Sequence, residues 1–206
     1  MKIVKVKTDS KNYDIKVGHD LLGSIPVKKL VSQKDILLLV DNKVPELLMN
    51  KLKNNLKKSS SKKINSIKIN ASENNKNLSY LAKVYDFLIR NNYSRDCVIF
   101  GVGGGITCDM TGFIASTFLR GVDFVLVPTT LLSQVDASIG GKTGVNHKGF
   151  KNMIGTFNQP VQVIIDTKFL KSLSKLEIQC GLMEVIKHGL ISCLLYTSDA
   201  ADEEAS

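Results

Sequence analysis

The segment from Arg120 to Asn152 concentrates side chains that can bind a small anionic molecule. Its polar members are Arg120, Thr129, Thr130, Gln134, Asp136, Lys142, Thr143, Asn146, Lys151 and Asn152. Apolar residues such as Leu131 and Val135 lie between them, so we expect part of the segment to be buried, where polar groups need hydrogen-bond partners. Lysine, arginine and asparagine donors suit a phosphate, and Asp136 can accept a hydrogen bond from a hydroxyl. The segment predicts a site for a phosphorylated small molecule.

A glycine triplet lies just before this segment. The apolar run 98–102 leads into Gly103, Gly104 and Gly105, and we expect a helix over 109–118. Glycines let backbone amides approach a phosphate, and the positive N-terminus of the following helix favours an anion. The triplet is neither the usual G-x-G-x-x-G fingerprint nor a Walker loop. It indicates a pyrophosphate loop, and a tight strand-to-helix turn is the alternative that the motif alone leaves open.

Short apolar runs alternate with helical patterns along the chain, and these elements must position the polar segment. We expect a hairpin at 3–18, strands at 35–41, 66–70, 97–102, 124–127 and 161–165, and helices at 21–30, 45–58, 78–92 and 109–118. Such alternation predicts an α/β fold with a largely parallel sheet. Ligands of these sheets bind beyond the carboxyl ends of the strands.

The charge composition bounds the class of partner. The 206 residues carry 28 Lys and Arg against 19 Asp and Glu, and only Arg90, Arg95 and Arg120 are arginines. Arginine is the usual reader of nucleic-acid bases, so a nucleic-acid partner is not favoured. The lysine-rich stretch 51–63 is interpreted as a solvated helix end and loop, with an anionic partner as the alternative.

The cysteines and the apolar runs bear on the compartment. Cys97, Cys108, Cys180 and Cys193 show no C-x-x-C spacing and lie in or beside apolar runs, as reduced core thiols do. No apolar run approaches the roughly 18 to 20 residues that span a bilayer. We therefore expect a cytoplasmic protein without a membrane partner.

The last residues differ in composition from the rest. Residues 196–206 contain Asp199, Asp202, Glu203 and Glu204 and no base. This tail resembles translated vector sequence and is set aside from the fold, and a solvated acidic terminus is the alternative.

Several segments together resemble one enzyme family. GGGITCDMTGFIAS, RGVDFVLVPTTLLSQVDASIGGKTGVN, GFKNMIGTFNQP and GLMEVIKHG are similar, in order and spacing, to 3-dehydroquinate synthases. The resemblance implies an NAD-binding, Rossmann-like domain at 1–175 and, at 176–195, the first helix of an all-helical domain that is mostly missing. It also implies NAD, Zn²⁺ or Co²⁺, a homodimer, and the shikimate-pathway conversion of 3-deoxy-D-arabino-heptulosonate 7-phosphate to 3-dehydroquinate and phosphate. We expect this chain alone to be inactive.

The resemblance also assigns roles to individual residues. It implies NAD contacts from Asp41, Glu73, Lys76, Gly104, Gly105, Ile106, Thr107, Cys108, Asp109, Thr129, Thr130, Lys142, Lys151, Phe169, Leu170, Lys171 and Ser172. It implies substrate or catalytic roles for Asp136, Lys142, Asn152, Lys187 and, across the dimer interface, Arg120. Cys108 stands where the family often has glycine, so the shape of the pyrophosphate loop is open to change by its side chain.

We expect this chain to contain only part of a metal site. Glu184 and His188 lie four residues apart, a spacing at which two side chains can share a metal. The resemblance makes Glu184 a ligand and takes the other two from histidines of the helical domain, so we interpret His188 as a neighbour. Another sugar-phosphate cyclase, a metal-dependent polyol dehydrogenase and a noncatalytic basic binding protein are the alternative functions.

Overall fold

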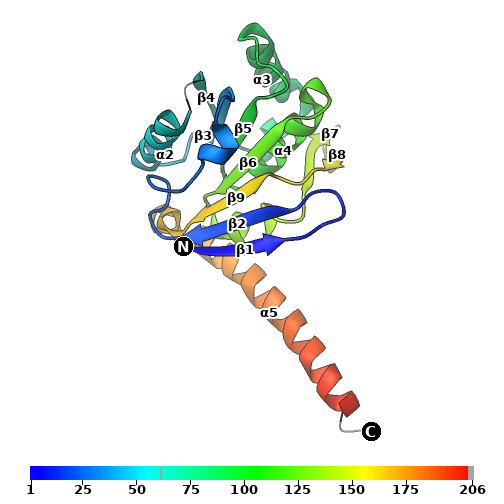
Figure 1. The fold of residues 1–206 in the computed structure, drawn as a ribbon. Coiled ribbons are helices and arrows are strands. Elements are labelled where there is room, and N and C mark those ends of the chain that lie inside the picture. The colour runs from blue at the N-terminus through cyan, green and yellow to red at the C-terminus, as the bar shows by residue number, and fades with distance from the viewer. Residues whose placement is uncertain (61, 204–206) are drawn as a thin grey trace.

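The computed structural model describes the backbone of residues 1–60 and 62–203, and the side chains of these residues as far as Ile191. A seven-stranded sheet in the order β1-β2-β9-β6-β5-β3-β4 forms its centre (Figure 1). These strands are β1 (Lys2–Val6), β2 (Tyr13–Gly18), β3 (Ile36–Asp41), β4 (Ile64–Ile69), β5 (Val98–Gly103), β6 (Asp123–Pro128) and β9 (Gln162–Asp166). Only the β1–β2 pair is antiparallel within this sheet, so the predicted, largely parallel α/β fold is confirmed.

Helices cover both faces of the sheet (Figure 1). The helices are α1 (Lys28–Val31), α2 (Glu46–Ser59), α3 (Leu78–Arg90), α4 (Gly105–Thr117) and α5 (Lys175–Glu203). Successive residues of a strand point to opposite faces, and β3 is buried on both. Leu38 packs in a core with Leu52 of α2, while Leu39 packs in a second core with Leu81 of α3 and Ile114 of α4. Two buried cores therefore fix the sheet between its helices.

The segment 21–30 does not form the expected helix. Only α1 is helical there, because Pro26 has no N–H to donate and its ring prevents a continuous helix through the segment. The buried carboxylate of Asp166 binds the turn that precedes this proline. It accepts hydrogen bonds from the backbone N–H groups of Asp20, Leu21 and Leu22 at 2.8, 2.7 and 3.3 Å.

The helix after the glycine triplet starts earlier than expected. It begins at Gly105 rather than Asp109, and the Cys108 N–H already donates to the Gly104 carbonyl at 3.1 Å. Gly104 is thus the N-cap of α4 and Gly105 its first residue. The free backbone amides of this first turn point beyond the carboxyl end of β5. The expected strand at 66–70 likewise begins earlier, as β4.

The polar segment contains a hairpin that the sequence patterns did not predict. Strands β7 (Lys142–His147) and β8 (Phe150–Phe157) pair antiparallel outside the main sheet. Lys148 and Gly149 form the turn with φ of 47° and 82°, the left-handed pair that two-residue hairpin turns require. The hairpin packs against α4, where a Cβ on Gly112 would lie 2.2 Å from Thr143 Cγ2. Glycine therefore permits the close approach of helix and hairpin.

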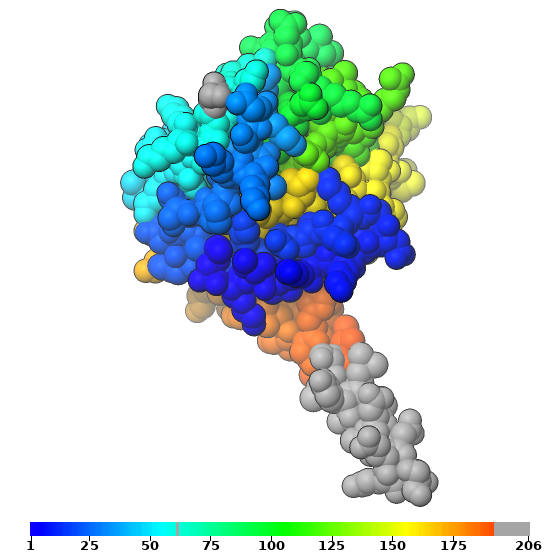
Figure 2. Space-filling model, viewed as in Figure 1, coloured from blue at the N-terminus to red at the C-terminus, as the bar shows by residue number. Residues whose placement is uncertain are grey.

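Helix α5 leaves the sheet and projects away from it (Figures 1 and 2). It passes close to the segment after β6, where a Cβ on Gly181 would lie 2.5 Å from Leu131 Cβ. The backbone of the tail predicted at 196–206 is helical as far as Glu203, and its side chains and last three residues lie outside the described part. Within the described residues, no helix combines the length and apolar character needed to cross a membrane.

Candidate functional site

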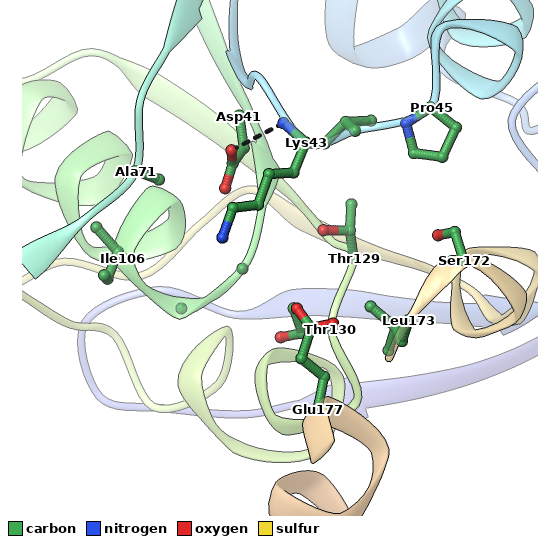
Figure 3. Close-up of a pocket in the computed structure, with 13 residues that line it drawn as sticks. Asp41, Lys43, Pro45, Ala71, Ile106, Thr129, Thr130, Ser172, Leu173 and Glu177 are labelled. Atoms are coloured by element: carbon green, nitrogen blue, oxygen red, sulfur yellow. Dashed lines mark hydrogen bonds between the residues drawn. The ribbon is translucent and has the colours of Figure 1, made fainter. Parts of the chain in front are cut away.

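A cavity of about 290 Å³ lies where β3, β5, β6 and β9 end at their carboxyl edge. It is lined by Asp41, Lys43, Val44, Pro45, Ala71, Gly104, Gly105, Ile106, Thr129, Thr130, Ser172, Leu173 and Glu177 (Figure 3). The structure thus brings together seven of the residues assigned to the cofactor: Asp41, Gly104, Gly105, Ile106, Thr129, Thr130 and Ser172. The N-terminus of α4 opens onto this cavity, as expected for a site that binds an anionic group.

Close packing around the glycines holds the loop in place. A Cβ on Gly103 would lie 2.3 Å from Thr107 Oγ1 and 3.0 Å from Asp41 Cβ, so only glycine fits between them. A Cβ on Gly104 would lie 3.2 Å from Thr130 Cγ2. The hydroxyl of Thr107 is buried without a hydrogen bond, which is consistent with packing rather than ligand contact.

Asp41 and Lys43 place opposite charges at the mouth of this cavity. The Asp41 carboxylate accepts a hydrogen bond from the Lys43 backbone N–H at 3.1 Å. Burial raises the pKa of Asp41, and the hydrogen bond and charge of Lys43 oppose the rise. Figure 3 shows the Lys43 amine extending between Ile106 and Thr129. Asp41 is positioned to accept from a hydroxyl, and Lys43 to pair with an anion.

Lys43 and Glu177 are cavity residues that the sequence reasoning missed. Glu177 belongs to a capping box at the start of α5, in which its Oε2 accepts from the Ser174 N–H at 2.9 Å and from Ser174 Oγ at 2.8 Å. These hydrogen bonds lower the pKa of Glu177. The Ser-x-x-Glu pattern at 174–177 is a signal that marks this helix start in the sequence.

A second cavity, of about 340 Å³, lies between Asp109 of α4 and the strands of the hairpin. Its lining includes Asp109, Lys142, Thr143 and Asn152. The ammonium of Lys76 donates to Asp109 Oδ2 and to Asn152 Oδ1, each at 2.5 Å, and Lys76 itself is buried. Burial raises the pKa of Asp109, while Lys76 opposes the rise. The exposed Lys142 and the amide of Asn152 provide the donors that a phosphate requires.

A third cluster joins the segment after β6 to α5. One ligand atom each of Asp136, Glu184 and His188 lies within 4.8 Å of the other two. Glu184 Oε1 is buried, lies beside Lys187 Nζ and is 3.1 Å from His188 Nε2, yet neither contact has hydrogen-bond geometry. Two carboxylates and an imidazole are suitable zinc or cobalt ligands, and the ion pair of Glu184 with Lys187 shows that this carboxylate already accommodates a positive charge. His188 is therefore a member of this cluster, whereas the sequence alone indicated a neighbour of the metal site.

Several residues to which the resemblance assigns cofactor contacts line neither of the two cavities and do not belong to the Asp136–Glu184–His188 cluster. Cys108 points into the core, and its burial raises the thiol pKa, so its side chain does not reshape the glycine loop. Phe169 is buried in the core beneath the cavity edge, in the short helix Thr167–Ser172 that also contains Leu170 and Lys171. Glu73 and Lys151 are exposed and lie 3.9 Å apart in a neighbouring polar cleft.

Arg120 lines a different cleft from Lys142 and Asn152. That cleft contains Lys11, Arg95 and Phe157 as well as Arg120, and it shares Phe157 with the second cavity. Leu119, Arg120 and Gly121 have successive positive φ values of 48°, 66° and 123°, which is a strained turn for the first two. Within one copy of the chain, Arg120 is therefore adjacent to the second cavity but does not line it.

The parallel sheet, the glycine turn and the clustered polar groups at one edge define an α/β domain of the dinucleotide-binding type. Residues 66–180 match the family model described as the 3-dehydroquinate synthase N-terminal domain. The chain belongs to the 3-dehydroquinate synthase family.

Relatives and solved structures agree with this assignment. The chain is 45% identical over 194 residues to 3-dehydroquinate synthase of Pelagibacter ubique, covering 92% of this chain and 51% of the relative. It therefore spans about half the length of the curated relatives that it matches. A Streptomyces hygroscopicus 2-epi-5-epi-valiolone synthase structure with NAD⁺ and Zn²⁺ is 28% identical, with a TM-score of 0.77 and coverage of 91% and 51% of the two chains. A 2-deoxy-scyllo-inosose synthase complexed with carbaglucose-6-phosphate, NAD⁺ and Co²⁺ shares the fold, with a TM-score of 0.83, 23% identity and coverage of 90% and 50%.

Proposed function

We propose that this chain forms the NAD- and phosphate-binding half of a 3-dehydroquinate synthase, a phosphorus–oxygen lyase of the shikimate pathway. The whole enzyme would convert 3-deoxy-D-arabino-heptulosonate 7-phosphate to 3-dehydroquinate and phosphate. The observation that carries the proposal is that α4 borders both cavities, so that the glycine loop at its start and the phosphate donors of the adjacent hairpin lie on two sides of one helix. The Co²⁺ and Zn²⁺ in the solved relatives' structures support a metal-dependent reaction.

The first cavity is the proposed NAD site. The amides of Gly104 and Gly105 at the start of α4 would bind the pyrophosphate, and Asp41 would accept from a ribose hydroxyl. Bound NAD supplies a reversible hydride acceptor for a substrate hydroxyl. Thr129 and Thr130 would hold the cofactor from the opposite wall, because both line the same cavity.

The second cavity is the proposed site of the substrate phosphate. Lys142 Nζ and the Asn152 amide would donate to its oxygens, which stabilises the charge that develops as phosphate leaves. This phosphate-binding pair favours a phosphorylated substrate over the simple polyol of a dehydrogenase with the same fold. The cavity lies beside Asp109 on α4, so the proposed phosphate and cofactor sites adjoin the same helix.

The third cluster is the proposed metal site. Glu184 would hold Zn²⁺ or Co²⁺, which would act as a Lewis acid toward a substrate oxygen. Asp136 would orient a substrate hydroxyl, and His188 is close enough to support the metal or its ligand. Lys187, now paired with Glu184, would turn to the substrate when a cation neutralises that carboxylate.

We further propose a cytoplasmic homodimer. Strand β8 exposes Phe150, Met153 and Phe157, whose exposed fractions are 67%, 65% and 81%. A partner copy that packs on β8 would bring its Arg120 toward the second cavity. Phe157 of β8 lines both this cavity and the cleft that contains Arg120. The buried free thiols Cys97 and Cys108 support a reducing compartment.

NADH titration of the 206-residue chain tests the cofactor site directly. We expect saturable enhancement of NADH fluorescence, and loss of the signal in Gly104→Val, because the added side chain crowds Thr130 and fills the cavity. Gly23→Val is the matched control, since a Cβ on Gly23 meets nothing within 4 Å. A folded wild-type chain that does not bind NADH would contradict the proposal.

A further inference from the structure

Lys76 is the most deeply buried lysine of the described ion pairs, with 4% of its side chain exposed. It lies just after the short helix Glu73–Asn75, and its ammonium is held between Asp109 on α4 and Asn152 on β8. It is not among the residues that line the first cavity. A buried ammonium that donates to two protein groups from separate elements is suited to fix them relative to each other.

The identity of the donor fixes the orientation of the Asn152 amide. A lysine ammonium has three donors and no acceptor, so its partner on Asn152 is the carbonyl oxygen, Oδ1. The other half of the amide, the Nδ2 donor, is then free of Lys76. Since Asn152 lines the second cavity beside Lys142, that cavity gains a second hydrogen-bond donor.

The backbone of Asn152 is held by the same segment. Asn152 has a φ of 54°, and its N–H donates to Asn146 Oδ1 at 2.9 Å. The Asn146 N–H donates in turn to the Lys76 carbonyl at 2.7 Å, and Asn146 Nδ2 donates to Glu73 Oε2 at 2.9 Å. Both the backbone and the side chain of Asn152 are therefore fixed from residues 73–76.

Lys76 also alters the charge of the cavity wall. The Asp109 carboxylate would repel an anion, and its ion pair with Lys76 compensates that charge. Asp109 lies on the helix whose first turn forms the glycine loop. One lysine thus couples the cofactor helix to the hairpin that carries the phosphate donors.

From these contacts we propose that Lys76 is a positioning residue, which turns the Asn152 amide so that its N–H donors face a bound phosphate and which neutralises Asp109. The inference rests on the proposed function, because it assigns the second cavity to the substrate phosphate. It is an alternative to the direct NAD contact that the family resemblance implies for Lys76, and the two roles differ in their effect on NADH affinity.

The test uses Lys76→Met in the 206-residue chain, with inorganic phosphate and NADH as separate probes. We expect phosphate affinity, measured from the Asn152 side-chain amide resonance, to fall by about tenfold or more, which corresponds to one lost charge-assisted hydrogen bond. NADH affinity should remain within about twofold of wild type, well below the effect of one such bond. Lys148→Met removes an exposed lysine from the same hairpin and should change neither affinity.

Two outcomes would overturn the inference. Unchanged phosphate affinity in folded Lys76→Met would show that Asn152 is oriented without the lysine, and a selective loss of NADH affinity would show a direct cofactor contact. If Lys76→Met does not fold, Lys76→Met/Asp109→Asn removes both buried charges and is tested in its place.

A ligand-free measurement separates this inference from the proposed function. The carbon-13 resonance of Asn152 Cγ reports the hydrogen bond to Oδ1, and we expect it to move upfield in Lys76→Met, or in Lys76→Met/Asp109→Asn if that chain is used. A resonance that stays in place contradicts the inference. A wild-type chain that binds neither phosphate nor NADH contradicts the proposed function instead.

Discussion

Carboxylate oxygens of Asp136 and Glu184 lie within 4.8 Å of each other, although one residue follows β6 and the other belongs to α5. Like charges at this separation repel unless a cation lies between or beside them. His188 Nε2 completes the group, and Lys187 Nζ lies on the Glu184 carboxylate. The approach of α5 to the segment after β6, made possible by Gly181, creates this cluster.

Glu184→Gln should weaken divalent-metal binding by this chain. Glutamine retains the size of the side chain but lacks the charge that a metal ligand provides. Loss of a residue that only hydrogen-bonds to a metal ligand lowers metal affinity by about 10- to 100-fold. We expect the Co²⁺ affinity to fall by at least this much, because Glu184 is a proposed ligand itself. Co²⁺ titration monitored by visible absorption measures the effect, and Glu46→Gln on α2 is the control. Equal Co²⁺ affinity in the two variants would rule out Glu184 as a ligand.

Gly112→Ala should destabilise the fold by separating α4 from the hairpin. The added methyl would lie 2.2 Å from Thr143 Cγ2, and overpacking of this kind costs about 1–3 kcal/mol. Thr143→Ser removes Cγ2 and leaves Cβ at 3.1 Å, so the double variant should recover about 1 kcal/mol of the summed loss. Urea unfolding of the four chains measures this coupling. Gly23→Ala should change stability by no more than about 0.5 kcal/mol, and strictly additive losses would contradict the packing account.

Asp41→Asn should make the chain more stable at pH 7 and weaken NADH binding. Because burial raises the pKa of Asp41 above its ordinary value of 3.8, the folded state retains the proton more strongly than the unfolded state. The free energy of unfolding therefore falls as the pH rises from that value through the folded-state pKa, and the penalty is complete above it. The gain from Asp41→Asn should disappear below pH 3.8.

Unfolding by urea at several pH values checks the stability effect of Asp41→Asn. NADH affinity should fall by about tenfold, as expected when a charged acceptor is lost. Asp9→Asn changes an exposed aspartate at the β1–β2 turn and should leave both quantities as in wild type. A loss of stability at pH 7 in Asp41→Asn would contradict the interpretation that burial disfavours the charged form of this carboxylate.

Ser174→Ala should destabilise the first turn of α5. The substitution removes the hydroxyl that donates to Glu177 Oε2 and accepts from the Glu177 N–H at 3.3 Å. Loss of such an N-cap costs about 1 kcal/mol. The change is measured by thermal or urea unfolding, with Ser79→Ala in the first turn of α3 for comparison. Equal stability of the two variants would mean that the capping box does not stabilise this helix start.

The parallel core could be predicted from the sequence because its strands are continuous apolar runs. Residues 36–41 are apolar except for the terminal Asp41, and every one of them is buried. Segment 21–30 was misinterpreted although Pro26 marks a break in the helical pattern. The hydrogen bonds that hold the turn before this proline depend on Asp166, a residue that is distant along the chain.

The candidate site was predicted in part. The glycine triplet and the polar segment contain Gly104, Gly105, Thr129 and Thr130 of the first cavity and Lys142 and Asn152 of the second, since their chemistry is evident from residue type. The hairpin was missed because its strands contain Gly144 and Gly155, which weaken the usual strand signal. The burial of Lys76 and the meeting of Asp136 with Glu184 depend on tertiary contacts between separate elements.

Phosphate release by a chimera tests the central claim most directly. Residues 1–190 of this chain are joined to the part of the Pelagibacter ubique relative that follows its matched region, and the product is supplied with NAD, Co²⁺ and 3-deoxy-D-arabino-heptulosonate 7-phosphate. We predict steady phosphate release with 3-dehydroquinate as co-product, and a loss of about 100-fold or more in kcat/KM for Lys142→Ala, which removes a stabilising charge. A folded chimera that binds NADH and Co²⁺ but releases no phosphate would contradict the account.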